Sequence, residues 1–404
     1  MPKFKYRALS KTGEINEQKD YEAESEEDLR SMLLSNGLSP LSIEELSTSK
    51  EINFNFTSKI KTKDLAIFCR QFATMIEAGV TINYSIDMLA TQVSNKKLRS
   101  ALSEISEDIK KGKALSEAMA SIDGYFPPLL ISMVEVGEMS GTLDSILNRM
   151  AEYYEKETKM NGKIRNAMIY PVILATVTIF VMCFILMYVM PMFIDMFASE
   201  GVELPVATKI TLALGEFLSS YWYIVLVIAI IMGIGFFYYT QKTENGQYIY
   251  NKYKLKRALM KELHQKIVVS RFTRALSTVL GSGISINQSL DVVGGVLGNK
   301  FADIQVKKVK ERILKGEGLA DPIRDTGVFP LMLSSMIKIG EESGSLDGIL
   351  EKTADFYDAE LERTIEALTT IIEPIMLVVM GIIVGFLIIS ILLPMFQMYE
   401  VMGG

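Results

Sequence analysis

The sequence predicts a mainly α-helical, polytopic membrane protein with two repeated cytoplasmic helical bundles, three transmembrane helices and a small N-terminal α/β module. Three observations lead to this fold class: apolar stretches without charged residues, an internal repeat, and helical spacing of apolar residues within that repeat. The composition agrees, because 49% of the 404 residues are hydrophobic and only 22% are charged. That balance is apolar for a soluble chain of this length.

Three stretches are long and apolar enough to cross a membrane. Residues 167–190, 218–239 and 375–398 contain no Asp, Glu, Lys or Arg. Each matches or exceeds the roughly 20 apolar residues that a helix needs to span the hydrocarbon core. We therefore expect three transmembrane helices.

The distribution of basic residues predicts their orientation. Lysine and arginine are frequent before the first span and after the second, whereas residues 191–217 carry one lysine among four acids. By the positive-inside rule, everything before residue 167 and the segment 240–374 are cytoplasmic. The loop 191–217 and the tail 399–404 then face the periplasm.

The chain repeats itself. MVEVGEMSGTLDSIL at 133–147 and MIKIGEESGSLDGIL at 336–350 are identical at nine of fifteen positions. The similarity extends back to 68–89 against 272–293, where Arg70 recurs as Arg274. It also extends forward into the first and third spans. Each copy is therefore a bundle and its following span, and the unmatched second span returns the chain to the cytoplasmic side.

Helix signals divide the copies into bundles at 63–166 and 240–374. In the first, Gly79 should end a helix, Asn95 should cap another, and Pro127–Pro128 should begin a third. Apolar alternation typical of strands is missing from both copies. Each copy is therefore expected to be an antiparallel helical bundle.

The repeated motif predicts a corner between two helices. Gly141 and Gly344 suit a left-handed helix end, and Thr142 could cap the next helix. That helix is expected to run from Leu143 into the membrane, with a kink near Pro171, whose counterpart in the second copy is Pro374.

The first 46 residues have a different pattern. Short strands are expected around residues 4–9, after Gly13 and at 38–46, with a helix over 25–36. Residues 1–46 thus form the predicted α/β module, and 47–62 are a polar linker.

The sequence offers no catalytic or cofactor-binding site. It lacks a phosphate-binding loop, and its one histidine and two cysteines nearly exclude a Cys/His zinc site. The three spans carry no ionisable group for a proton relay or an intramembrane protease. The basic stretch 252–266 is explained by the topology and is also compatible with contact to anionic lipid. It lacks interleaved stacking aromatics, so no nucleic-acid partner is expected. An enzyme is not expected either.

Two glutamates at equivalent positions, Glu138 and Glu341, are the remaining candidates. A carboxylate near the C-terminal end of a helix is electrostatically unfavourable, so its recurrence needs a cause. One interpretation is a solvated or salt-bridged side chain. The other is contact with a partner or a divalent cation, together with Glu135 or Glu342.

The duplicated FP…GE-x-SG-x-L…Y pattern, followed by P-x-x-L at the start of a span and PMF at its end, resembles a known family over the whole chain. It is similar to the inner-membrane platform proteins of type II secretion and type IV pilus systems (the GspF/PilC family), which also serve DNA uptake. The resemblance implies six-helix cytoplasmic bundles and a homo-oligomer in the bacterial inner membrane. It also implies contacts with a ring-forming cytoplasmic ATPase, with pilin-like subunits and with other assembly proteins, and no catalytic residues.

Two other classes of function stay open at this stage. An oligomeric channel or transporter would need polar residues along a pathway, for which Thr176, Thr178 and Ser390 are available in the spans. A membrane enzyme would need an activated nucleophile or a carboxylate pair near the bilayer, and the sequence shows neither.

Overall fold

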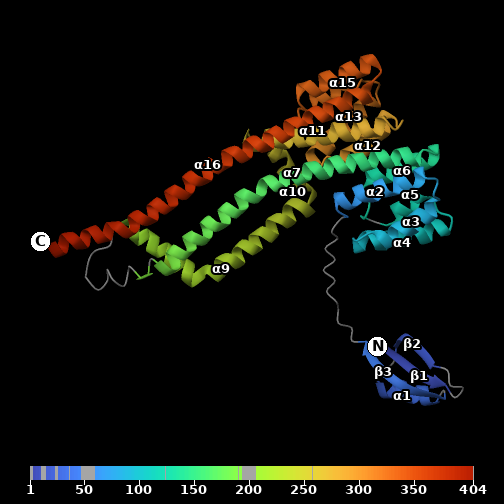
Figure 1. Ribbon diagram of the computed structural model, residues 1–404, viewed down its shortest axis with the longest axis horizontal. Coiled ribbons are helices and arrows are strands. Elements are labelled where there is room, and N and C mark those ends of the chain that lie inside the picture. The colour runs from blue at the N-terminus through green and yellow to red at the C-terminus, as the bar shows by residue number, and fades with distance from the viewer. Residues whose placement is uncertain are drawn as a thin grey trace. The chain divides into compact units, whose positions relative to one another are not determined.

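The computed structural model describes residues 3–10, 15–22, 26–35, 37–46, 60–122, 124–189, 191–192, 206–256 and 258–403. The chain divides into two compact units, Met1–Ser58 and Lys59–Gly404. In the part described, every strand belongs to the smaller unit, and the larger unit is helical throughout (Figure 1).

The smaller unit is a three-stranded antiparallel sheet with one helix. Its strands are β1 (Lys3–Ser10), β2 (Ile15–Glu22) and β3 (Leu38–Leu46), in the order β2-β1-β3. Helix α1 (Glu26–Ser35) contributes Leu29 and Leu33, four residues apart on one face, to a small core with Tyr6 and Ala8. The expected N-cap of this helix, Ser25, lies outside the described residues.

The first copy of the repeat forms six helices. They are α2 (Thr62–Glu77), α3 (Ile82–Gln92), α4 (Lys96–Lys110), α5 (Leu115–Ser121), α6 (Pro128–Ser140) and α7 (Leu143–Phe184). The local signals in the sequence are confirmed. Gly79 follows α2 with φ +80°, Pro128 is the first residue of α6, and the Asn95 side chain accepts hydrogen bonds from the first turn of α4.

The second copy also forms six helices. They are α11 (Ala258–Leu280), α12 (Ile286–Val296), α13 (Lys300–Ile313), α14 (Ala320–Asp325), α15 (Leu331–Ser343) and α16 (Leu346–Gly403). Equivalent aromatic pairs pack in the two bundles: Phe68 with Phe126 and Phe272 with Phe329, at ring-centroid distances of 6.2 and 4.7 Å. Buried residues of both copies belong to one hydrophobic cluster, so the bundles fold against each other.

Two helices leave the bundles and continue into apolar sequence. Helix α7 passes through Pro171 without a break and is followed by a π-helical turn, η1 (Ile185–Val189). Helix α16 runs for 58 residues from the corner at Gly344. In Figure 1, α7 and α16 run in the same direction away from the bundles. The expected continuity between bundle and span is therefore confirmed in both copies.

Two helical segments of the described chain are long and apolar enough to cross a membrane, Leu143–Val189 and Leu346–Leu393. A third span would consist of Leu226–Lys242 together with Glu244–Leu255, two helical pieces that meet at 93°. The bend lies between α9 (Val206–Lys242) and α10 (Glu244–Lys256). Large apolar side chains such as Phe180 and Ile382 are exposed along these segments, which is typical of a surface that meets lipid.

Helix α9 begins at Val206, well before the expected start of the second span. The first turns of α9 contact α16: the Thr208 hydroxyl donates to the Ser390 carbonyl at 2.7 Å, and Thr211 bonds the Ser390 hydroxyl at 3.0 Å. All three side chains are buried. Polar groups in an apolar environment need such partners. The pairing therefore stabilises a helix over residues 206–217, which were expected to be a loop.

The same contact bears on the channel hypothesis. Ser390 faces α9, and the hydroxyls of Thr176 and Thr178 donate to the carbonyls of Val172 and Leu174 in their own helix. Each of the three polar side chains proposed to line a pathway is thus hydrogen-bonded within the chain. The described structure gives the channel hypothesis no support.

Candidate functional site

The repeated motif forms the same corner in both copies. Gly141 has φ 70° and Gly344 has φ 66°, the left-handed conformation that glycine adopts without steric cost. The next residue donates its N–H back into the helix, from Thr142 to the Gly137 carbonyl at 3.0 Å and from Ser345 to the Gly340 carbonyl at 3.1 Å. These are the bonds of a Schellman motif, so the predicted helix ends are confirmed.

The earlier glycine of the motif permits close packing of the two helices. A Cβ at Gly137 would lie 3.1 Å from the Leu143 Cα, and one at Gly340 would lie 3.0 Å from the Leu346 Cα. The helix before the corner thus lies against the first residue of the helix after it. This close approach accounts for the glycines at 137 and 340, where a side chain would meet the next helix.

One local prediction for the corner is wrong. The Thr142 side chain makes no capping hydrogen bond to α7. Its hydroxyl instead lies 2.7 Å from that of Ser140. The Schellman turn holds Thr142 at φ −113° and ψ 35°, away from the extended conformation that a capping residue adopts.

The repeated glutamates cap short helices elsewhere in their own bundles. The Glu138 carboxylate accepts the backbone N–H groups of Leu115 and Ser116 at 2.6 and 2.9 Å, at the start of α5. The Glu341 carboxylate accepts those of Leu319 and Ala320 at 2.5 and 3.3 Å, at the start of α14. A negative charge is favourable at a helix N-terminus, which offsets its unfavourable position in its own helix.

The capping carboxylates keep contact with solvent, since Glu138 is half-buried and Glu341 is exposed. Glu135 and Glu342, the other proposed cation ligands, are exposed on α6 and α15. Among the described residues, no group of three or more His, Cys, Asp or Glu side chains is placed to hold a metal ion. Cation binding by the four glutamates stays a prediction from the sequence.

We expect Glu138→Ala to lower the free energy of unfolding by about 1–2 kcal/mol, because two N–H groups of α5 lose their acceptor. Glu138→Gln keeps one acceptor oxygen and should cost less. Glu135→Ala, on an exposed position of the same helix, should change stability by about 0.5 kcal/mol or less. Denaturant unfolding of the detergent-solubilised protein measures all three, and equal losses for Glu138→Ala and Glu135→Ala would contradict the capping role.

Each bundle also contains an ion pair at equivalent positions of the repeat. Arg70 of α2 donates to both carboxylate oxygens of Glu155 on α7, each at 2.9 Å, which lowers the pKa of Glu155. Arg274 of α11 pairs with Asp358 on α16, and with Asp355 at 2.9 Å. The arginine recurs visibly in the sequence, and an acid also recurs at its partner's position, but nothing local links the two.

A second set of polar contacts joins the two copies. Lys156 on α7 pairs with Asp355 on α16 at 3.2 Å, and Lys163 pairs with Glu362. Just before the two prolines, the Tyr170 hydroxyl donates to Glu373 at 3.4 Å. Pro171 and Pro374 thus lie beside a contact between equivalent positions of the repeat. No local pattern in the sequence indicates these pairs, because their partners are about two hundred residues apart.

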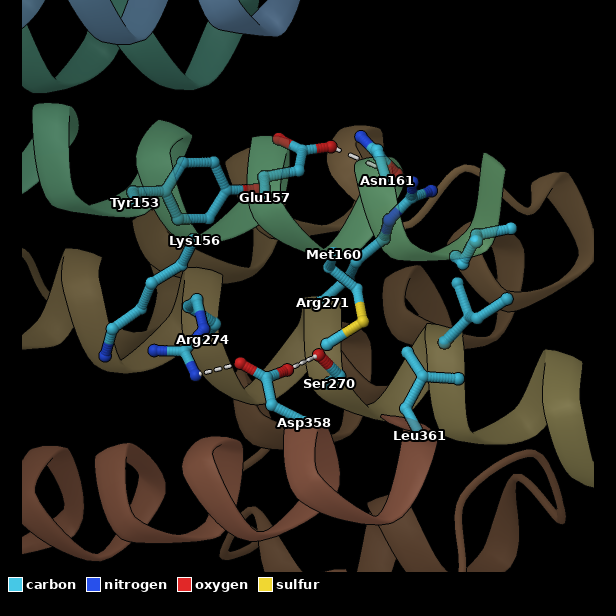
Figure 2. Close-up of a pocket in the computed structure, with 12 residues that line it drawn as sticks. Tyr153, Lys156, Glu157, Met160, Asn161, Ser270, Arg271, Arg274, Asp358 and Leu361 are labelled. Atoms are coloured by element: carbon cyan, nitrogen blue, oxygen red, sulfur yellow. Dashed lines mark hydrogen bonds and ion pairs between the residues drawn. The ribbon is translucent and has the colours of Figure 1, made fainter. Parts of the chain in front are cut away.

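Figure 2 shows the junction of α7, α11 and α16, where Lys156, Arg274 and Asp358 are among the residues that line a small cavity. Glu157 approaches Arg271 at 3.8 Å, and burial raises the pKa of Glu157 despite that positive charge. The cavity measures about 30 Å³, room for about one water molecule. Its ion pairs and size are typical of a structural junction rather than of a substrate site.

A larger cavity, about 560 Å³, lies between the first bundle and α12. Aromatic and apolar side chains such as Tyr125, Phe126 and Ile131 line it, together with Val296 of α12. The buried Tyr154 hydroxyl on its wall has no hydrogen-bond partner among the residues that the structure describes. The described lining contains no arrangement of nucleophile and base that would indicate catalysis.

Comparison with known proteins relates this architecture to a family. The family model for type II secretion system protein F matches residues 68–191 and 272–394, the two copies of the repeat. The model for the N-terminal domain of the same protein matches residues 1–44.

Relatives that match along the full length of the chain point to the same family. The type IV pilus assembly protein PilC of Thermus thermophilus is 35% identical over 98% of both chains. PilC of Myxococcus xanthus is 34% identical over 98% of this chain and 94% of its own. The type II secretion system protein F of Vibrio cholerae is 30% identical over the full length of both. Together with the two apolar helices, these matches indicate an inner-membrane protein, and the chain belongs to the type II secretion system protein F family.

Proposed function

We propose that this chain is the inner-membrane platform of a type II secretion or type IV pilus-like machine. In this role it couples a cytoplasmic assembly ATPase to the assembly of pilin or pseudopilin subunits into a filament. The observation that carries the proposal is the continuity of α7 and α16 from the bundles into apolar segments. Displacement of a bundle would pass along these helices into the membrane.

The helices are long and braced, as transmission of motion requires. At 1.5 Å per residue, the 58 residues of α16 span about 87 Å. The pairs Lys156–Asp355 and Lys163–Glu362 tie α7 to α16 before both enter apolar sequence. The two bundles would therefore move the spans together rather than one at a time.

We further propose three membrane spans, 167–190, 218–239 and 375–398, with the N-terminus cytoplasmic and the C-terminus periplasmic. A cysteine replacing Met192, which is 74% exposed just beyond the first span, should react with an impermeant thiol reagent in intact spheroplasts. A cysteine replacing Leu314, 62% exposed in the second bundle, should react only after lysis. The reverse pattern would overturn the orientation and the cytoplasmic position of the bundles.

The partners follow from the proposed role. They are a ring-forming cytoplasmic ATPase, pilin-like or pseudopilin subunits, other inner-membrane assembly proteins, membrane lipids along the basic stretch 252–266, and further copies of the chain. Because the sequence lacks a phosphate-binding loop, the chain itself should not hydrolyse ATP.

Purification of the tagged full-length protein from mild detergent tests this partnership. We expect a nucleotide-hydrolysing protein of the host to co-purify, and we expect the chain freed of that partner to hydrolyse no ATP. Intrinsic ATP hydrolysis, or filament assembly in cells that lack every such ATPase, would refute the proposal.

A further inference from the structure

The apolar segment of α9 ends in a sharp corner. Leu226–Lys242 of α9 and Glu244–Leu255 of α10 meet at 93°. The corner is closely packed, because a side chain at Gly246 would meet the Tyr239 carbonyl in the last turns of α9. Since α9 is proposed to cross the membrane, a helix at a right angle to it runs along the membrane surface. Helix α10 therefore lies at the cytoplasmic end of the second span, at the level of the lipid headgroups.

One side of α10 faces the second bundle. The helix packs on α11 and α13. The ring of Tyr248 meets that of Phe301 on α13 at a centroid distance of 5.6 Å. Leu255, which lies seven residues after Tyr248 and so on the same side of the helix, is buried. This side of α10 is therefore occupied within the chain.

The other side of α10 is apolar and uncovered. Ile249 and Tyr253, one turn apart on this side, are 56% and 49% exposed. Tyr250 lies beside Tyr253 and packs on Phe236 of α9, with the ring centroids 5.8 Å apart. Phe236 is itself 60% exposed. The uncovered side of α10 is thus continuous with the exposed apolar surface of the span.

Two lysines border this apolar side. Lys252 lies one turn after Ile249, and Lys254 lies one turn after Tyr250. The Lys252 ammonium is 5.5 Å from the centre of the Tyr248 ring, and the Lys254 ammonium is 4.2 Å from that of Tyr250. A cation on the face of a ring is held in place while its other side stays open to an anion. The border of the apolar side is therefore suited to negative groups.

We infer that α10 is an interfacial helix that binds anionic phospholipids of the cytoplasmic leaflet. Ile249 and Tyr253 enter the boundary between headgroups and acyl chains, and Lys252 and Lys254 meet the phosphates. An apolar side bordered by lysines fits such a surface, and tyrosine is enriched at this depth. The position of α10 directly after the span argues for lipid as the occupant. The inference rests on the proposed topology and deepens the proposed lipid contact of residues 252–266.

This contact bears on the position of the second bundle. Helix α10 links the span to α13, where the Asn299 side chain donates to the Asn251 carbonyl at 3.4 Å. Asn299 caps α13 and is buried, so the start of that helix rests on α10. Anionic lipid bound by α10 thus holds the bundle at a set height above the bilayer.

Quenching of fluorescence by brominated phospholipid tests the depth of α10. The single tryptophan, Trp222, is replaced by phenylalanine, and Tyr253→Trp supplies a new probe in the full-length protein. In vesicles of phosphatidylglycerol and phosphatidylcholine, phosphatidylcholine brominated near the top of its acyl chains should quench this probe strongly. Ile339→Trp, on a residue 47% exposed on α15, should stay unquenched. An unquenched probe at 253, or equal quenching at both positions, would overturn the inference.

Competition between lipid classes tests the lysines. Native mass spectrometry of the full-length protein in detergent, with equal amounts of phosphatidylglycerol and phosphatidylcholine, measures which lipid is retained. Lys252→Gln/Lys254→Gln should raise the apparent dissociation constant of the tightest-bound phosphatidylglycerol by at least about tenfold. Lys308→Gln/Lys315→Gln, which removes two exposed lysines elsewhere in the second bundle, should leave it unchanged. Equal effects of the two pairs, or no preference for phosphatidylglycerol in the unaltered chain, would contradict the lipid site.

A charge-conserving variant separates lipid binding from folding. Lys252→Arg/Lys254→Arg keeps both positive charges and should bind phosphatidylglycerol as the unaltered chain does. A loss as large as that of the glutamine pair would mean that charge is not what the lipid recognises. Neither measurement needs an ATPase or a filament, so their failure would leave the proposed function standing. Failure of the ATPase test would likewise leave the lipid contact standing.

Discussion

Replacing Arg274 by methionine is expected to lower the free energy of unfolding of the second bundle by about 3–5 kcal/mol. The equivalent change in the first copy, Arg70→Met, should cost about 1 kcal/mol or less. The two arginines occupy the same position in the repeat and both pair with an acid on the long helix. The expected difference comes mainly from burial, and Arg274 also pairs with a second acid, Asp355.

The surroundings of the two side chains explain the difference. Arg274 is 10% exposed and its partner Asp358 is 22% exposed, whereas Arg70 and Glu155 are 39% and 48% exposed. Methionine keeps much of the length and apolar volume of the arginine but leaves Asp358 largely buried without its positive partner. Glu155 loses its partner near solvent, where water replaces much of the interaction.

Denaturant unfolding of the full-length protein in detergent, followed by circular dichroism, measures both variants. The double variant Arg274→Met/Asp358→Leu removes both charges and should recover part of the stability, because the loss comes mainly from an unpaired buried charge. Equal losses for Arg70→Met and Arg274→Met, or no recovery in the double variant, would contradict this account.

Features encoded by neighbouring residues could be predicted from the sequence. The corners at Gly141 and Gly344 depend on a glycine that must end one helix, and Asn95 caps the helix directly after it. The continuity of α7 follows from an unbroken helical pattern, which the structure extends through Pro171. In each case the cause lies within about one helical turn of the effect.

Features that depend on the tertiary arrangement could not be predicted. Glu138 caps α5 although 22 residues separate it from Ser116, and the sequence does not indicate that α5 begins beside it. Helix α9 begins at Val206, and its first turns are hydrogen-bonded to Ser390 of a helix much later in the chain. The pair Lys156–Asp355 requires the packing of two copies whose relative placement no local pattern encodes.

A proline in the cytoplasmic part of α7 should separate binding of the ATPase from filament assembly. Met160→Pro removes a backbone hydrogen bond and places a ring against the preceding turn, at a cost of about 3 kcal/mol of local helix stability. The position lies between Glu157, which faces Arg271, and Lys163, which pairs with Glu362. A break there interrupts the helix after the bundle and before the apolar segment.

The bundle itself should survive this change, since its buried α7 residues end at Tyr154, more than one turn earlier. We therefore expect the variant to co-purify with the ATPase as the unaltered chain does, while filament assembly or secretion falls by at least about tenfold. Met160→Leu, which keeps the helix and the apolar side chain, should assemble normally. Normal assembly with Met160→Pro would mean that motion does not pass through α7, and the proposed coupling would then have to be abandoned.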